Sequence, residues 1–196
     1  MEILYTDPHI VVCIKPVGMD SEGDVPNALS EAVGGTFFPV HRLDKNVGGV
    51  MVYARTKAAA AELSKAIQNN TMVKEYVALV HGTPPENGDW EDLLFKDSSK
   101  NKVFVVKKER KGVKKARLEF QRLTGSDPAL VRIRLHTGRS HQIRVQFASR
   151  GYSLLGDHKY GARDDCQSPM LFSCKLTFPL FGKKHCFEAF PAWAEQ

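Results

Sequence analysis

The sequence predicts one α+β domain, in which a few helices lie on a largely antiparallel sheet. The chain has 196 residues, a length that fits a single domain. The first half mixes short apolar runs with two helix-like segments, and the second half holds three consecutive segments of alternating polarity with polar breaks between them. That second pattern is typical of antiparallel strands. We therefore expect residues 1–196 to form one domain with a mixed, mostly antiparallel sheet.

Three segments are predicted to be helical. Residues 56–70 are the clearest, because a threonine can cap the first turn and two apolar residues lie four apart on one face. Residues 25–35 form a shorter helix that ends in glycines. Residues 139–151 follow a Thr-Gly turn and end in a glycine, and His141 and Arg144 are three apart and share a face there.

The other regular segments are predicted to be strands, because their apolar residues run together or alternate. They are residues 10–15, 48–54, 73–82, 102–108, 114–123 and 129–138. A final hairpin is expected around Phe181, Gly182 and Lys183. These strands would supply most of the sheet.

The composition favours a partner that carries many negative charges. The chain has 28 basic and 22 acidic residues and a net charge of +6, and excess positive charge attracts phosphate groups. Its four cysteines have no CxxC spacing, so neither a zinc ribbon nor a disulfide framework is expected. No apolar run is as long as a membrane span and no signal peptide is visible, so the cytoplasm is the expected location.

Two segments are candidates for chemistry, residues 39–56 and 135–161. Asp44 lies between Arg42 and Lys45 in a loop that leads into a strand, and functional groups are common at such places. The alternative for Asp44 is a surface ion pair with either neighbour. Arg144 could equally be an ordinary surface residue of a helix.

Other candidates also have plain structural readings. Tyr76 could be a core residue with its hydroxyl at the rim, and His41 and His141 could be capping or packing residues. The histidines have no metal-binding pattern such as HExxH, and the chain has no phosphate-binding glycine loop. No metal and no cofactor are therefore expected.

The stretch "KKERKGVKKAR", residues 107–117, holds seven basic residues and one acid. We call it the basic segment. It reads as a solvated hairpin or as a contact for a nucleic-acid backbone, because it has no aromatic residue on which a base could stack. In the second reading Lys107, Lys108, Lys114 and Lys115 would contact the phosphates.

Five stretches of the chain together resemble one enzyme family. "HRLDKNVGG" resembles the HRLDxxTSG motif of the RluA-type RNA pseudouridine synthases, and "TGRSHQIRVQFASRGYSLLGDHKYG" resembles that family's TGRTHQIRxHLxxxGxPxxGDxxYG block. "VVCIKPVGM", "VKEYVALVHG" and "FEAFPAW" are similar to its opening strand, its KxYxALVxG strand and its closing segment. The five stretches occur in the family's order and span nearly the whole chain.

The resemblance implies a bent mixed sheet in two halves with a basic central cleft. It implies conversion of specific uridines in structured RNA, ribosomal or transfer, to pseudouridine without a cofactor. On this reading Asp44 is the essential carboxylate, acting as base or as nucleophile, Tyr76 lies against the flipped-out base, and Arg144 pairs with Asp44. Arg42, His41 and Arg139 are then expected to contact the RNA.

The chain departs from the family pattern at Val47, Gly48 and Gly49, which replace TSG, so one possible hydrogen bond of the loop is lost. It begins directly at the catalytic segment, so we expect no separate N-terminal RNA-binding domain, and we see no sign of an obligate protein partner.

Two rival functions have less support from the sequence. A hydrolase using Asp44 with His41 or His141 would lack the usual second carboxylate or metal. A non-catalytic RNA-binding module would not need to keep Asp44, Tyr76 and Arg144.

Overall fold

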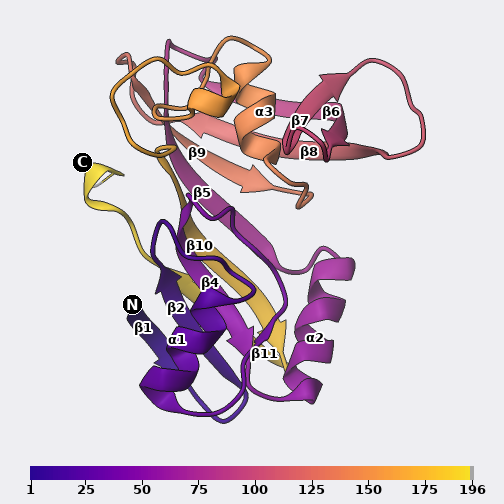
Figure 1. Cartoon of the computed structure of the whole chain (residues 1–196), viewed down its shortest axis with the longest axis vertical. Coiled ribbons are helices and arrows are strands. Elements are labelled where there is room, and N and C mark those ends of the chain that lie inside the picture. The colour runs from indigo at the N-terminus through magenta and orange to yellow at the C-terminus, as the bar shows by residue number, and fades with distance from the viewer. Residues whose placement is uncertain (195–196) are drawn as a thin grey trace. The chain divides into compact units, whose positions relative to one another are not determined.

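The computed structural model describes residues 1–194 and confirms a mixed, mostly antiparallel sheet with few helices. Eleven strands belong to one sheet, and three α-helices occur among the described residues (Figure 1). The chain divides into two compact units. The first unit is Met1–Glu75 with the segment from Phe172 onwards, and the second unit is Tyr76–Leu171.

The first unit contains the strands expected near both ends of the chain. Its helices are α1 (Asp24–Val33) and α2 (Lys57–Gln68), both close to their predicted bounds. Thr56 caps α2, since its hydroxyl accepts a hydrogen bond of 3.1 Å from the Ala59 amide. The strands are β1 (Glu2–Thr6), which the sequence did not indicate, β2 (Ile10–Lys15), the short β3 (Phe38–Pro39), β4 (Gly48–Ala54), β10 (Leu171–Leu180) and β11 (Lys183–Glu188).

Strand β4 is the centre of the first unit. It pairs antiparallel with β2 from Gly49 to Ala54, and every one of its residues is buried. Alternate residues of β2 and β4 face the apolar side of α2, where the buried cluster also includes residues of β10. A strand buried on both faces needs a continuous apolar run, which explains why the sequence signal for β4 was clear.

Gly48 and Gly49 start β4 where it pairs in parallel with Phe172 and Ser173 of β10. Gly49 has a φ of +133°, and a Cβ there would overlap the backbone of Ser173. Only glycine combines that backbone angle with so close an approach. The strand therefore begins at a point where no side chain fits, directly after the loop that holds Asp44.

The second unit contains β6 (Asn87–Asp97), β7 (Lys102–Val106), β8 (Val113–Arg122), β9 (Ala129–Leu135) and the short helix α3 (Gln142–Ala148). With β5 (Val73–Val80), whose first residues belong to the first unit, the strand order is β5-β9-β8-β6-β7. β6 was not predicted, because charged residues such as Glu91 and Asp92 interrupt its apolar pattern. It is nevertheless the longest strand, and it pairs with a neighbour on each side.

The prediction of a hairpin for the basic segment is wrong. β7 and β8 do not pair with each other, since both pair antiparallel with β6, one along each side. Residues 107–112 therefore pass from one side of β6 to the other. The Arg110 guanidinium lies 4.4 Å from the centre of the Phe95 ring as the chain crosses. The error follows from missing β6, which separates two strands that look adjacent in the sequence.

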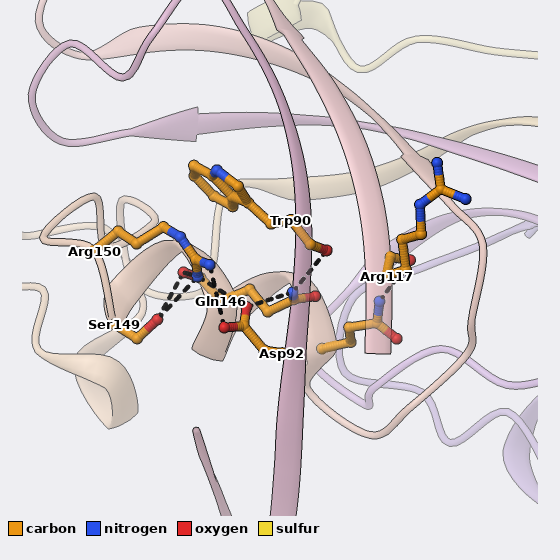
Figure 2. A network of polar contacts seen from close by, with 7 residues as sticks. Trp90, Asp92, Arg117, Gln146, Ser149 and Arg150 are labelled. Carbon is orange, nitrogen blue, oxygen red and sulfur yellow. Dashed lines mark hydrogen bonds and ion pairs between the residues drawn. The ribbon is translucent and has the colours of Figure 1, made fainter. Parts of the chain in front are cut away.

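Helix α3 packs against β6 and β7 of the second unit (Figure 1). Phe147 of this helix meets the rings of Trp90 and Phe120 at centroid distances of 4.8 and 5.2 Å. Figure 2 shows the polar part of the same contact, where the Gln146 amide reaches the Asp92 carboxylate at 2.7 Å and Arg150 binds that carboxylate at 2.9 and 3.1 Å. Apolar and charged contacts thus fix α3 on the sheet together.

Among the described residues no helix combines the length and the apolar character needed to cross a membrane.

We expect Gly49→Ala to lower the free energy of unfolding by at least about 2 kcal/mol, because the methyl group would strain the backbone and displace β10 from β4. Urea titration of the purified variant measures this change. Gly125→Ala is the control, since a Cβ at Gly125 meets no atom within 4 Å. Equal stability of the two variants would show that the approach of Ser173 does not constrain residue 49.

Candidate active site

The loop that carries Asp44 is fixed on its N-terminal side by Ser21. The Ser21 hydroxyl donates to the Leu43 carbonyl at 2.9 Å and accepts from the Leu43 amide at 3.1 Å. The carbonyl of Ser21 in turn accepts a hydrogen bond from the buried Tyr53 hydroxyl at 2.9 Å. Because Ser21 and Tyr53 are themselves buried, the residue just before Asp44 has little freedom to move.

The C-terminal side of the same loop is fixed by Lys15. This side chain is fully buried, and its Nζ donates to the carbonyls of Pro16, Met19 and Lys45 at 2.9, 2.8 and 3.2 Å. The Lys45 carbonyl also accepts from the Gly18 amide at 2.8 Å. Burial lowers the pKa of Lys15 to about 8, and nearby carboxylates, Asp44 among them, oppose that shift.

Asp44 is therefore held between two fixed residues, and its own carbonyl accepts a hydrogen bond of 2.9 Å from the Val47 amide. Its side chain is half-buried. A carboxylate on a rigid loop with an ammonium group in its electrostatic neighbourhood can accept a proton or attack a carbon without first reorganising.

His41 and Arg42, at the start of this loop, have different surroundings. The Nε2 atom of His41 accepts a hydrogen bond of 3.1 Å from the Val52 amide, in line with the packing role left open in the sequence analysis. Burial, with a smaller effect from Lys74, lowers the pKa of His41 to about 3, so its ring is neutral at physiological pH. Arg42 is exposed and lies 3.1 Å from the Glu22 carboxylate.

In the second unit, Arg144 is bound by a carboxylate that the sequence analysis had not assigned. Nε and Nη2 of Arg144 donate to the two oxygens of Asp157 at 2.7 and 2.8 Å. The side chains are 3% and 1% exposed. Arg144 is therefore not a surface residue, and its guanidinium is held in a two-pronged ion pair.

A tyrosine from the same stretch as Asp157 adds a second contact. The guanidinium carbon of Arg144 lies 5.2 Å from the centre of the Tyr160 ring. The Tyr160 hydroxyl lies 2.8 Å from Nδ1 of His141 and accepts from the Val103 amide at 2.9 Å. His141 thus contacts the tyrosine whose ring lies beside Arg144, although His141 precedes the helix and so does not share a helical face with Arg144.

Helix α3 begins later than predicted, at Gln142, because His141 has a left-handed backbone with a φ of 51°. The buried Gln142 side chain accepts from Thr137 at 2.7 Å and from the Arg139 amide at 3.1 Å, and donates to the Arg117 carbonyl at 3.1 Å. Arg139 therefore precedes the helix. Its Nε donates to the Lys115 carbonyl at 3.0 Å, which places the two basic residues next to each other.

The lysines of the basic segment that we expect to contact phosphate, Lys107, Lys108, Lys114 and Lys115, are all exposed. Arg117, by contrast, binds Asp89 through two hydrogen bonds of 2.9 and 2.8 Å and lies 3.1 Å from Glu119. Lys115 Nζ also lies 3.9 Å from the Glu109 carboxylate, so part of the charge on these lysines is balanced within the segment. Tyr76 is 6% exposed and lies on β5.

The structure brings the predicted site residues into two groups. His41, Arg42 and Asp44 share one loop of the first unit, and Arg139 and Arg144 lie at and in α3 of the second unit. Sequence reasoning missed Lys15, Ser21, Asp157 and Tyr160, although three of them lie in or beside quoted motifs. No group of three or more His, Cys, Asp or Glu side chains that could bind a metal occurs within residues 1–194.

A family model described as RNA pseudouridylate synthase matches residues 9–149. The ribosomal large subunit pseudouridine synthase D of Zymomonas mobilis is 32% identical over 190 residues, which cover 88% of this chain and 60% of that protein. The dual-specificity RNA pseudouridine synthase RluA of Escherichia coli is 33% identical over 203 residues, covering 95% of this chain and 91% of that protein.

The chain spans between 51% and 60% of the length of four of its curated relatives. Two solved human structures share the fold. Human RNA Pseudouridylate Synthase Domain Containing 4 superposes with a TM-score of 0.82 at 24% identity, over 98% of this chain and 89% of that chain. Human RNA Pseudouridylate Synthase Domain Containing 1 gives a TM-score of 0.85 at 21% identity, over 97% and 83%.

The protonation state of His41 predicts how the free energy of unfolding depends on pH. Its folded pKa of about 3 lies below the ordinary value of 6.5, so between these values the unfolded chain binds more protons at this position. We expect the free energy of unfolding to fall as pH is lowered from 6.5 towards 3, and His41→Gln to flatten that dependence. Urea titrations at several pH values measure it, with His9→Gln, at an exposed histidine, as control. An unchanged slope in His41→Gln would contradict this account.

Proposed function

The chain belongs to the RNA pseudouridylate synthase family, and we propose on that premise that it isomerises uridines in RNA to pseudouridine. The observation that carries the proposal is the family match over residues 9–149, which includes Asp44, Tyr76 and Arg144. The named relatives from Zymomonas mobilis and Escherichia coli support it, as their names describe pseudouridine synthases. Ribosomal RNA and transfer RNA are the substrate classes we propose, and the cytoplasm is the proposed location.

We assign the central chemical role to Asp44. Pseudouridine forms when the bond between ribose and uracil nitrogen breaks and a bond from ribose to uracil carbon 5 replaces it, so the reaction needs neither an oxidant nor a donor of a chemical group. An ionised carboxylate beside the sugar can start it by taking a ribose proton or by attacking the sugar. The rigid loop around Asp44, fixed by Ser21 and Lys15, suits either route.

Arg144 and Tyr76 complete the proposed site. Arg144 is a permanent cation, and we propose that it keeps the Asp44 carboxylate ionised and oriented. We propose that Tyr76 forms part of the surface against which the flipped-out base lies. Extruding that base costs a few kcal/mol, which stacking and phosphate contacts offset.

We propose that Arg42, Arg139 and the exposed lysines of the basic segment contact the RNA backbone. Lys107, Lys108, Lys114 and Lys115 are exposed, and the Lys115 carbonyl accepts from Arg139, so Arg139 lies beside this segment in the second unit. His41 is a weaker candidate for an ionic contact, because its ring is neutral and its Nε2 already accepts the Val52 amide.

We expect Asp44→Asn to abolish pseudouridine formation without changing the fold, because an amide of the same size is neither a base nor an anionic nucleophile. Tritium release from RNA labelled at carbon 5 of uracil measures the reaction, and circular dichroism checks the fold. Glu31→Gln, at an exposed carboxylate of α1, makes the same chemical change away from the loop and should keep full activity. Substantial turnover by Asp44→Asn would remove Asp44 from its assigned role, and release of free uracil by the wild-type chain would indicate a hydrolase.

We expect replacement of Lys107, Lys108, Lys114 and Lys115 by glutamine to weaken RNA binding. Each lost phosphate contact should flatten the slope of log affinity against log salt by about 0.7 to 0.9. Binding isotherms at several salt concentrations give the slope, and the rate on fully bound RNA should change little. The control replaces Lys57, Lys65, Lys183 and Lys184, four exposed lysines of the first unit, and so makes the same charge change. Equal slopes for the two variants would show that the basic segment does not contact the RNA.

A further inference from the structure

The ion pair between Arg144 and Asp157 is unusual in how completely it is removed from water. The two side chains are only 3% and 1% exposed, and both oxygens of Asp157 accept from the guanidinium. Burying two charges costs free energy that their attraction does not reliably recover, so such a pair is weak evidence for a purely stabilising role. A role in fixing the orientation of Arg144 explains the arrangement better.

The geometry of the pair determines which way the guanidinium faces. Asp157 binds Nε and Nη2, which form one edge of the planar group. The donors on the other edge then have a fixed direction, because the two parallel hydrogen bonds prevent rotation about the last side-chain bonds. A lysine could not be held in this way, since its ammonium group has no planar edge.

The segment that supplies Asp157 is itself rigid. The Asp157 carbonyl accepts from the amides of Tyr160 and Ala162 at 2.9 and 3.2 Å, and the Asp157 amide donates to the Leu154 carbonyl at 3.1 Å. Residues His158–Tyr160 form a short 3-10 helix, η1. This turn places the Tyr160 ring beside the guanidinium, while the Tyr160 hydroxyl is held by His141 and Val103.

We propose that Asp157 is the positioning residue of Arg144 in the isomerisation, and that Tyr160 supports it. The inference rests on the proposed function. Asp157 contacts neither the RNA nor the reacting atoms in this role. It holds the guanidinium in one orientation, with the edge away from Asp157 pointing in a fixed direction, and so keeps Arg144 in the state that its proposed role requires.

The same helix region offers a matched comparison. Arg150 also binds a carboxylate with two prongs, that of Asp92, at 2.9 and 3.1 Å (Figure 2). That pair is more exposed, at 28% and 12%, and it joins the end of α3 to β6. Asp92→Asn therefore breaks an Arg–Asp pair of the same unit without touching Arg144.

The first experiment measures kcat and KM for tritium release by the full-length Asp157→Asn chain. We expect kcat to fall about 100-fold, as for a misplaced catalytic group, with KM for RNA little changed. Arg144→Ala should lose at least as much, and the double variant should be no slower than Arg144→Ala alone, because Asp157 acts through Arg144. Asp92→Asn should keep the wild-type kcat. Additive losses in the double variant, or an equal loss in Asp92→Asn, would overturn the proposal.

A second readout does not need activity. The NMR signal of the Arg144 Nε–H group should move when Asp157 becomes asparagine and stay in place in Asp92→Asn. If the wild-type chain forms no pseudouridine in total RNA, the proposed function fails, and this signal still decides whether Asp157 holds Arg144. An unmoved signal would overturn the positioning role.

If Asp157→Asn does not fold, Tyr160→Phe serves in its place. The variant keeps the ring beside Arg144 but loses the hydroxyl that His141 and Val103 hold. We expect a smaller loss of kcat with KM unchanged, and again no further loss on the background of Arg144→Ala. A wild-type kcat in this variant would show that the segment does not orient Arg144.

Discussion

The loop that carries Asp44 depends on one buried ammonium group. Lys15 donates hydrogen bonds to the carbonyls of Pro16, Met19 and Lys45, and so joins the end of β2 to the far side of the loop. Burial without a carboxylate partner in hydrogen-bond contact makes this costly, as the lowered pKa of Lys15 records. The compensation is geometric, because the turn at residues 16–19 and the loop at Lys45 are brought to one point. Ser21 fixes the opposite side of the loop through the backbone of Leu43, and burying its neutral hydroxyl costs less than burying an ammonium group.

The two candidate groups are built in different ways. Around Asp44 the supports are hydrogen bonds from Ser21 and Lys15 to backbone groups of Leu43 and Lys45, which fix the path of the chain. Around Arg144 the supports are two side chains. Asp157 forms an ion pair with one edge of the guanidinium, and the Tyr160 ring lies against its face. The proposed roles fit this difference: a carboxylate that reacts needs a rigid loop beneath it, and a guanidinium that only stays charged needs a rigid partner.

Sequence patterns predicted the elements whose burial is simple. β4 reads as a continuous apolar run, and α2 has both a cap and an apolar stripe, so their bounds were nearly correct. β6 was missed because it carries charges such as Asp92, which the structure pairs with Arg150, and local periodicity cannot reveal a partner 58 residues away. The partner of Arg144 was missed for the same reason. Asp157 was visible within a quoted motif, but a motif names residues and does not say which of them touch.

The first unit is discontinuous in sequence, and this has a consequence for how the chain is made. Its apolar cluster includes Leu176, Phe178 and Leu180 of β10, the other buried members all lie before Glu75, and the whole of Tyr76–Leu171 comes between. On the ribosome the second unit is therefore complete before the first can close. Until β10 leaves the exit tunnel, β4 lacks its partner at Gly48 and Gly49 and the apolar cluster lacks the β10 side chains, which is a state that chaperones recognise and that aggregation exploits. The order of synthesis thus makes the part of the chain that emerges first the last to reach its final structure.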